Sequence, residues 1–296
     1  MRVVFYASDK PREHMLANAL RQGVERAGDQ FEQRRTQDYG ETEGGDYRKY
    51  PGPTPDTDVA VFFGVKGQSR EIMDEHLAMG RATIYLDKGV TRQKGSGHTL
   101  YTRAFVNAPH PLKYMLREKQ RADRFNALGM SLQERRKGNN ILFCGSSLKF
   151  HAFHKILPPT EFAAQVYREI RKYTDQPVIY RPKPSNNYMP PIAGTLFSPA
   201  SQTLQQALAG AHCMITYGSG AAFYAICAGV PVISLGPSIA APVADTAVAN
   251  VRQPYWASAE SRQRWANAVA YTQFTIEEMA SGFAWGHLKA IIQHGS

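Results

Sequence analysis

Short apolar runs alternate with helix-like segments along most of the sequence, and this alternation restricts the folds that the chain can adopt. The clearest case is residues 215–233. An apolar run there ends at Thr216-Tyr-Gly-Ser-Gly220, a stretch of small residues follows, and Gly229-Val-Pro leads into a second apolar run. Apolar runs of about 4–8 residues bounded by turn residues are typical of buried strands. Repeated strand–helix–strand order requires right-handed crossovers and predicts an α/β fold with mostly parallel sheets.

The same pattern gives the expected elements. Strands are predicted at residues 3–6, 58–64, 82–86, 140–144, 177–180, 212–217 and 230–235. Helices are predicted at residues 12–27, 160–173, 201–209 and 221–228, and between Ser69 as N-cap and Gly80. Residues 117–137 resemble an exposed charged helix followed by a linker, and residues 258–292 a long helical segment. We therefore expect two α/β halves divided near Gly138.

Composition excludes several classes of protein. Hydrophobic residues make up 43% of the 296 residues and charged residues only 20%, so a sizeable core can be buried and disorder is not expected. The sequence has no apolar run of about 18 residues, which a membrane span requires. Its first residues do not form a signal peptide. Three irregularly spaced cysteines, Cys144, Cys213 and Cys227, fit neither a disulfide framework nor a zinc site, so we expect a cytoplasmic protein.

The positive charge is concentrated in one stretch. The chain has 35 Lys and Arg against 25 Asp and Glu, a net charge of +10. Residues 88–137 contain twelve of these cations and only three acidic residues, which accounts for nearly all of the excess. Such a cluster favours a polyanionic partner such as nucleic acid, an acidic membrane surface or phosphorylated sugars. Basic residues that simply solvate the outer face of a helix would give the same pattern.

The Gly218-Ser-Gly220 turn is a candidate phosphate site. Glycine permits tight turning and close approach of a ligand to the backbone. The helix that follows presents N–H groups and the positive end of its dipole, which suit a phosphate, and the Ser219 hydroxyl is a further donor. An ordinary strand–helix turn that needs glycine for its geometry is the alternative.

Two more segments carry suitable groups directly after strands. Arg181-Pro-Lys-Pro-Ser185 follows one strand, and Gly145-Ser-Ser147 follows another. In open parallel sheets, ligands bind beyond the carboxyl ends of the strands. The cations Arg181 and Lys183 would neutralise a diphosphate without a metal ion. Because the loops lack acidic residues, we expect no obligatory divalent cation.

The segments 178–185 and 216–233 together resemble the donor-binding half of GT-B glycosyltransferases. They are most similar to the capsule-polysaccharide, Kdo-transferase-like type and to phage-encoded glycosyltransferase-like proteins. The tail Ala270-Tyr-Thr-Gln-Phe-Thr-Ile-Glu-Glu-Met-Ala-Ser-Gly-Phe-Ala-Trp285 and the segment Tyr85-Leu-Asp-Lys-Gly-Val-Thr-Arg92 are similar to those phage proteins. One position departs from the family pattern. Many GT-B enzymes have a ribose-binding glutamate just before the alanine of the small-residue helix, where this chain has Tyr224.

The resemblance implies two Rossmann-like domains facing a cleft. Residues 1–138 would bind the acceptor, residues 139–296 would bind the nucleotide-sugar, and the final helix would cross back to the first domain. We expect a UDP-sugar donor and no other cofactor. The expected donor and phosphate ligands are Arg181, Lys183, Ser185, Tyr217, Gly218, Ser219, Gly220, Gly145, Ser146 and Ser147.

The acceptor hydroxyl needs a general base, and the first half offers candidates. Asp87 is the first choice because it ends the predicted strand 82–86 and lies in the segment that carries the resemblance. Asp9, after the first strand, is the second choice, and His98 is a weaker one. A capping or turn aspartate is the structural alternative for Asp87. Ser8 and Lys10, beside Asp9, are expected to contact phosphate or acceptor.

The basic stretch predicts double-stranded DNA carrying a hydroxylated pyrimidine, of the 5-hydroxymethyl type, as the acceptor. Cations contact phosphates, and aromatic residues interleaved with them can stack on extruded bases. Core packing is the simpler explanation for most of these aromatics: Tyr101, Phe105, Tyr114 and Phe125. The expected acceptor-binding cations are Lys88, Arg92, Lys94, Arg103, Arg117, Arg121 and Arg124. Two alternatives stay open: a glycosyltransferase acting on an envelope saccharide or lipid-linked acceptor, and a non-catalytic nucleic-acid-binding protein on a GT-B scaffold.

Overall fold

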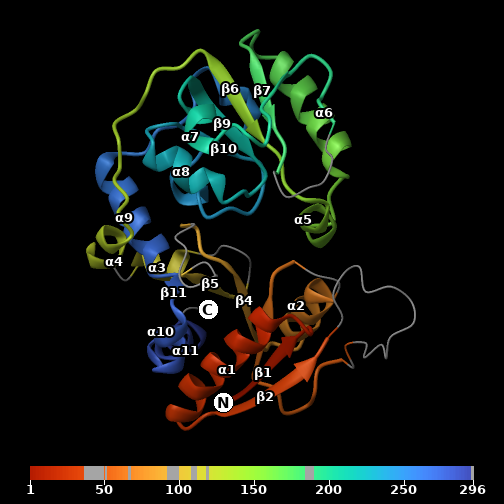
Figure 1. Cartoon of the computed structure of the whole chain (residues 1–296), viewed down its shortest axis with the longest axis vertical. Helices are drawn as coiled ribbons and strands as arrows, with labels where there is room; N and C mark the ends of the chain where they lie inside the picture. Colours follow the sequence, from red (N-terminus) through yellow and green to blue (C-terminus); the bar gives the residue numbers. More distant parts are fainter. Residues whose placement is uncertain are drawn as a thin grey trace. The chain divides into compact units, whose positions relative to one another are not determined.

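A computed structural model describes residues 1–36, 50, 52–65, 68–91, 100–107, 112–117, 120–183 and 190–294. The chain forms two compact units, each built around its own sheet (Figure 1). The first unit contains Met1–Arg117 and Tyr271–Ser296, and the second contains Glu118–Ala270. The division therefore falls after Arg117 and again after Ala270. The sequence, in contrast, suggested a single division near Gly138. The predicted α/β class with mostly parallel sheets is confirmed.

The sheet of the first unit has the strand order β11-β5-β4-β3-β1-β2. Its parallel strands are β1 (Arg2–Ala7), β2 (Gln30–Arg35), β3 (Val59–Phe63) and β4 (Ala82–Lys88). Strand β5 (Thr102–Val106) runs antiparallel to β4, and β11 (Gln273–Phe274) runs antiparallel to β5. The sequence analysis missed β2, β5 and β11.

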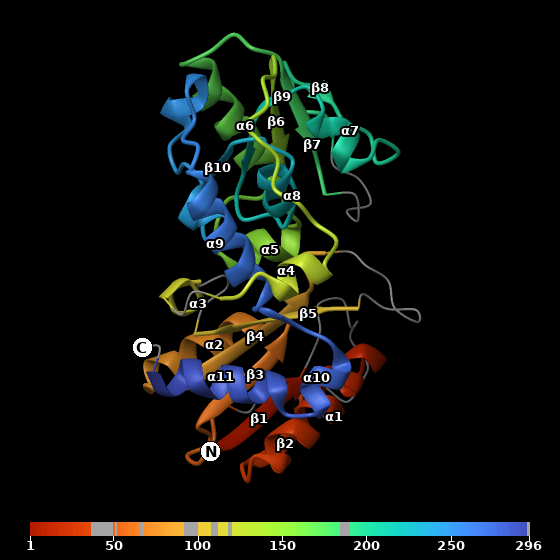
Figure 2. The same cartoon turned by 90° about the vertical axis from the view of Figure 1, so that its left-hand side faces the viewer.

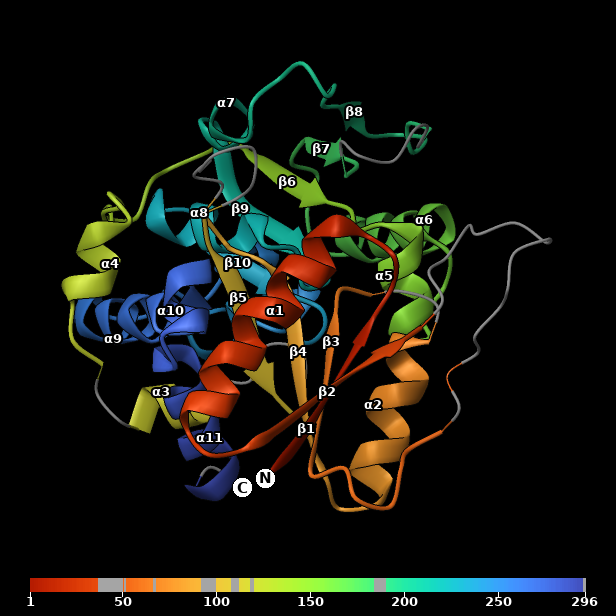
Figure 3. The same ribbon diagram turned by 60° about the horizontal axis from the view of Figure 1, so that its bottom comes forward.

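Helices cover both faces of this sheet. α1 (Pro11–Arg26), α10 (Ile276–Ala280) and α11 (Phe283–His294) lie together on one face (Figure 2). α2 (Ser69–Ala78) packs on β3 and β4 from the other face (Figure 3), and α3 (Lys113–Arg117) ends the first chain segment of the unit. The core between the sheet and the first group buries Phe5, Leu16, Leu20, Trp285 and Leu288. The end of the chain thus packs on its beginning, as the resemblance implied.

A buried aspartate joins α11 to the turn before β2. Asp29 accepts hydrogen bonds from Trp285 Nε1 at 2.7 Å and from Lys289 Nζ at 2.8 Å. Burial alone would raise the pKa of the Asp29 carboxyl, but the hydrogen bonds from Lys289, the Met1 amino group and Trp285 lower this pKa to about 2. These bonds hold a carboxylate in its ionised form inside the first unit.

The sheet of the second unit has the strand order β10-β9-β6-β7-β8, and all its strands are parallel. The strands are β6 (Asn140–Cys144), β7 (Val178–Arg181), β8 (Leu196–Phe197), β9 (Ala211–Thr216) and β10 (Val232–Ser234). Four of them coincide closely with predicted strands. β8 was not predicted, because two residues are too short for a recognisable pattern.

Helices flank this second sheet on opposite sides (Figures 1 and 2). α6 (Pro159–Arg171) packs on one face, where Ala163, Val166 and Ile170 meet Ile141 and Phe143 of β6. α8 (Ala221–Cys227) contacts β9 and β10. The other elements are α4 (Asp123–Ala127), α5 (Leu148–Phe153), α7 (Leu204–Leu208), α9 (Ala259–Ala270) and the short 3-10 helices at Ala241–Val243 and Val248–Arg252.

Three local predictions are wrong. Residues 117–137 do not form one exposed helix: α3 ends at Arg117, α4 covers Asp123–Ala127, and residues 130–138 have no regular structure. The segment 258–292 is interrupted by β11, because Phe274 is buried in the core of the first unit and Gln273 pairs with β5. Ser69 is the first residue of α2, and the N-cap is Gln68.

Candidate functional site

The carboxyl ends of four neighbouring strands lie level with each other in the second unit. Cys144 at the end of β6 is in register with Arg181 at the end of β7 and with Thr216 at the end of β9. Thr216 is in turn level with Ser234 at the end of β10. The three segments that the sequence singled out, beginning at 145, 181 and 217, therefore follow one edge of one sheet. This is the edge at which open α/β sheets bind ligands.

The Gly218-Ser-Gly220 turn uses its two glycines differently. Gly218 has a φ of +85°, and a Cβ there would lie 2.4 Å from the carbonyl oxygen of Pro237. Gly220 has a φ of −60°, and a Cβ there would meet no heavy atom within 4 Å. The fold therefore requires glycine at 218, whereas glycine at 220 leaves open space beside the backbone.

Several N–H groups expected to face a phosphate are bonded within this turn. Ser219 N–H donates to Thr216 Oγ1 at 3.2 Å, and Ala221 N–H donates to Ser219 Oγ at 3.2 Å. The N–H groups of the next two residues donate to the carbonyl oxygens of Ser219 and Gly220. α8 is also short, with seven residues. Side chains at this edge are consequently better placed than the helix end to bind a ligand.

The segment after β6 is buried and partly committed to structure. Ser147 caps α5 by accepting a hydrogen bond from the Phe150 N–H at 3.3 Å. Ser146 is 7% exposed, and a Cβ at Gly145 would lie 3.0 Å from Tyr180 Oη. The predicted phosphate-binding role of these residues stays a prediction.

Arg181 is held in place by the strand that the sequence did not reveal. The side chain is 8% exposed, and Nη1 donates to Ser198 Oγ at 2.7 Å and to the Pro199 carbonyl oxygen at 3.4 Å. Ser198 directly follows β8, so the guanidinium stays at the carboxyl edge. Lys183 is exposed, and Ser185 lies outside the described residues.

An aromatic cluster that the sequence analysis missed lies beside the turn. The Tyr217 ring is 6.2 Å from Phe150, 5.7 Å from His154 and 5.5 Å from Phe162, measured between ring centroids. Burial raises the pKa of the Tyr217 hydroxyl. The Phe150-His-Ala-Phe-His154 run was its only sequence signal, because the contacts depend on α5 lying next to the end of β9.

The first unit gathers a second set of predicted residues at one sheet edge. Ser8, Asp9 and Lys10 follow β1, and Asp87 and Lys88 end β4. Strand β3 separates β1 from β4, so these two groups are about 10 Å apart along the edge. Asp9 forms an ion pair with Arg35, and the buried Ser8 N–H donates to Glu13 at 2.8 Å.

Asp87 lies inside β4 instead of after it, and faces Arg103 of β5. Arg103 Nη2 donates to Asp87 Oδ2 at 2.6 Å, and Arg103 is only 7% exposed. This charge-assisted hydrogen bond fixes the orientation of the Asp87 carboxylate. Arg103 is therefore a partner of Asp87 and no surface cation, while Lys88 beside it is exposed.

The predicted acceptor-binding cations are divided between the two units. Arg117 belongs to the first unit, whereas Arg121 and Arg124 belong to the second. Arg117 and Arg121 are exposed, and Arg124 Nε donates to the Ala270 carbonyl oxygen at 3.4 Å. Arg92, Lys94 and His98 lie outside the described residues, as does the side chain of Tyr114. Phe105 and Phe125 are 2% exposed, so both are core residues and cannot stack on a base.

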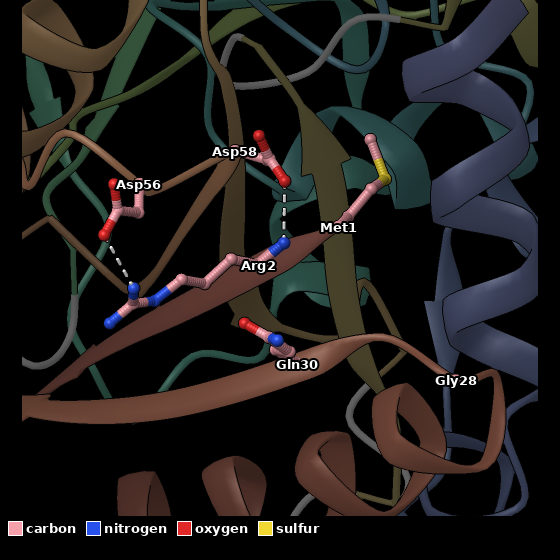
Figure 4. A pocket seen from close by; sticks show the side chains of 6 residues that line it. All are labelled: Met1, Arg2, Gly28, Gln30, Asp56 and Asp58. Atoms are coloured by element: carbon pink, nitrogen blue, oxygen red, sulfur yellow. Dashed lines mark hydrogen bonds and ion pairs between the residues drawn. The ribbon is translucent and has the colours of Figure 1, made fainter.

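A surface depression of about 490 Å³ lies at the other end of the first sheet (Figure 4). It is lined by Met1, Arg2, Gly28, Gln30, Asp56 and Asp58. The backbone N–H of Arg2 donates to Asp58 at 2.7 Å, and Arg2 Nη1 donates to Asp56 at 3.1 Å. None of the predicted site residues contributes to this depression, whose charged groups pair with each other.

Clustered metal ligands and membrane-spanning helices are both absent from the described residues. No group of three or more His, Cys, Asp or Glu side chains is arranged to hold a metal ion in that part of the chain. Likewise, no helix among those residues has the length and apolarity needed to cross a bilayer. The three cysteines are buried and unbridged, and burial raises the pKa of each thiol to about 12.

Comparisons with known proteins identify the fold. No family model and no curated protein matches the sequence. Among solved structures, the beta Kdo 2,7 transferase of Thermosulfurimonas dismutans KpsC is similar over 98% of this chain and 100% of that chain, with a TM-score of 0.55 and 13% identity. The beta Kdo 2,4 transferase of the same KpsC is similar over 90% of each chain, with a TM-score of 0.53 and 11% identity. The chain thus has a fold of the expected GT-B type.

Proposed function

We propose that the chain is a glycosyltransferase that uses a nucleotide-sugar donor. The observation that carries this proposal is the level row of strand ends in the second unit, which gathers Arg181, Lys183 and Ser219 along one edge. The likeness in fold to two proteins described as Kdo transferases supports sugar transfer. The sequence resemblance supports the same donor class.

In the proposed reaction, the bond between the anomeric carbon and the phosphate oxygen breaks. The nucleotide leaves with the bonding electron pair, and the positive charges of Arg181 and Lys183 stabilise the charge that develops on its phosphate. The acceptor oxygen forms the new bond to the anomeric carbon. Its proton passes to Asp87, with Asp9 as the second candidate base. The step requires no metal ion.

Binding of the donor tests this proposal directly. We expect one member of a panel of UDP-, CMP-, GDP- and dTDP-sugars, with the UDP-sugars first, to raise the unfolding temperature of the full chain. Lys183→Ala should weaken this binding by about tenfold to a hundredfold, because a charge-assisted contact contributes roughly 1.5–3 kcal/mol.

Lys172→Ala is the matched control. Lys172 is an exposed lysine of the same unit, but it directly follows α6, at the end of the unit where β7 begins. Its removal should leave donor binding unchanged. Equal effects of the two substitutions, or no binding of any sugar nucleotide, would refute the donor site and favour a non-catalytic protein.

For the acceptor, we propose double-stranded DNA with a hydroxylated pyrimidine. The net charge of +10 and the exposed Arg117 and Arg121 support a polyanionic partner. Charge reversal at both arginines should lower DNA affinity and reduce its dependence on salt, while donor binding is retained. Reversal of two exposed cations on α1, Arg21 and Arg26, is the control for net charge. Unchanged DNA affinity after reversal at 117 and 121 would exclude this acceptor.

An envelope saccharide or lipid-linked saccharide is the second candidate acceptor. It is favoured by the two Kdo transferases with the same fold. A transfer assay with labelled donor separates the candidates, since hydroxymethylated duplex DNA and an acidic oligosaccharide can be offered in parallel. Label in the oligosaccharide alone would select the second candidate.

A further inference from the structure

Arg103 has an unused hydrogen-bond donor in a buried position. The residue lies in β5, opposite Asp87 of β4 and Gln273 of β11. Its Nε donates to the Lys88 carbonyl oxygen at 2.8 Å and its Nη2 to Asp87 at 2.6 Å. Nη1 is buried and has no hydrogen-bond partner among the described residues. A buried charged donor without an acceptor loses its hydration with no compensation, so native proteins contain few of them.

A second unused donor lies at the same end of the sheet. The Thr91 side chain is 3% exposed, and its hydroxyl has no hydrogen-bond partner in the part of the chain that the structure covers. Thr91 follows Val90, whose N–H donates to Gln273 Oε1 at 2.7 Å. Gln273 is the cross-strand neighbour of Arg103. Thr91 is therefore one residue along the chain from a bond to Gln273, the cross-strand neighbour of Arg103.

The chemistry of these donors identifies the class of ligand. A guanidinium N–H and a hydroxyl can both donate to an oxyanion, and arginine binds carboxylate and phosphate groups with particular strength. The Asp87 side chain is 29% exposed, so solvent reaches this group beside the buried guanidinium. An arginine that holds Asp87 on Nη2 can hold a ligand oxygen on Nη1. Such a ligand would be fixed close to the proposed base.

We propose that Arg103 and Thr91 bind a carboxylate or phosphate group of a small acidic acceptor, next to Asp87. The proposal rests on the proposed sugar transfer, and it favours the second candidate acceptor, a saccharide, over duplex DNA. The burial of Arg103 favours an oxyanion carried by a sugar over the backbone of a duplex, whose phosphates are contacted by exposed cations. Arg103 then has two roles: it orients Asp87 and it recognises the charge of the acceptor.

The test measures thermal unfolding of the full chain with inorganic phosphate, with glucuronate, and with glucose as the uncharged control. Phosphate or glucuronate should stabilise the wild type, and glucose should not. Arg103→Lys should weaken this binding about tenfold or more, because lysine offers one point of contact in place of the planar fork. Thr91→Val should also weaken it, by about threefold to tenfold.

Thr83→Val is the matched control for Thr91→Val. Thr83 is also buried, at 1% exposure, and its hydroxyl also lacks a hydrogen-bond partner within the described residues. It lies near the opposite end of β4, about 13 Å along the strand from Asp87. Neither valine variant should unfold at a lower temperature than the wild type, because neither loses an internal hydrogen bond. Only Thr91→Val should lose affinity for the oxyanion.

Three results would overturn the proposal. The first is that neither acid stabilises the wild type. The second is that Lys183→Ala abolishes the stabilisation while Arg103→Lys and Thr91→Val retain it, which would place the oxyanion in the second unit. The third is that only duplex DNA depends on Arg103. Donor binding is measured in parallel, so failure here with sugar-nucleotide binding intact leaves the proposed function standing.

Discussion

Replacing each glycine of the Gly218-Ser-Gly220 turn by alanine separates a structural requirement from space left for a ligand. Gly218→Ala places a side chain at a φ of +85°, which costs about 1–2 kcal/mol for an L-residue. The new Cβ would also lie 2.4 Å from the Pro237 carbonyl oxygen. Relief of that overlap by backbone movement costs roughly 1–3 kcal/mol. We therefore expect Gly218→Ala to destabilise the second unit by about 2–5 kcal/mol.

Gly220→Ala should behave differently. Its φ of −60° is ordinary for alanine, and the added Cβ meets no atom within 4 Å. The expected change in unfolding free energy is within about 1 kcal/mol in either direction. Its effect should appear in donor affinity, because the Cβ occupies open space at the ligand edge.

Equilibrium urea unfolding can be monitored by hydrogen exchange in peptides from residues 120–183 and 190–270. These peptides report on the second unit alone. This matters because two units can unfold in separate transitions. Similar destabilisation by both alanines would refute the distinction between the glycines. A loss of less than about 1 kcal/mol for Gly218→Ala would show that the turn can relax around a Cβ.

Three further predictions concern the stability of the units and the chemistry of buried groups. The pKa of Asp29 is lowered from 3.8 to about 2, so its bonds to Trp285 and Lys289 stabilise the first unit above pH 3.8 by roughly 2 kcal/mol, and this contribution is lost as the pH falls from about 4 to 2. The stability of Asp29→Asn should not fall in this way between about pH 4 and 2. The same fall in unfolding free energy in both proteins over that pH range would contradict the prediction. Burial raises the pKa of the Cys144, Cys213 and Cys227 thiols to about 12. A thiol reagent at pH 8 should therefore label the native protein far more slowly than the urea-unfolded protein. The labelling rate is measured by mass spectrometry, and equally fast labelling of the native protein would disprove this prediction. Phe125→Ala should lower the free energy of unfolding by about 3–5 kcal/mol, because the ring is a core side chain. If calorimetry showed unchanged stability together with lost DNA binding, Phe125 would be a stacking residue.

Apolar runs made much of the fold predictable from sequence. Strands β3, β6 and β9 consist almost entirely of buried apolar residues, so their pattern reflects their position inside a sheet. The edge strand β2, Gln-Phe-Glu-Gln-Arg-Arg, has no such pattern, because most of its side chains are exposed or half-buried. β8 and β11 have two residues each, and their pairing depends on neighbours far away in the sequence.

The candidate site was predictable where residues directly follow strands. Arg181, Gly218 and Ser219 could be assigned to one edge because parallel strands end on the same side of a sheet. Their partners could not be predicted. Ser198 reaches Arg181 through β8, and Arg103 faces Asp87 because β5 runs antiparallel to β4. Both contacts join segments whose strands gave no clear signal in the sequence.

The first unit is built from two distant stretches of chain. This constrains the order in which the two units can fold during synthesis. A ribosome synthesises all of residues 118–270 before it adds Phe274, Trp285 and Leu288, which complete the core around α1. The second unit is continuous and can mature while the first still exposes apolar surface. Released chains that end at residue 270 should consequently hold a protease-resistant second unit joined to an incompletely folded amino-terminal part.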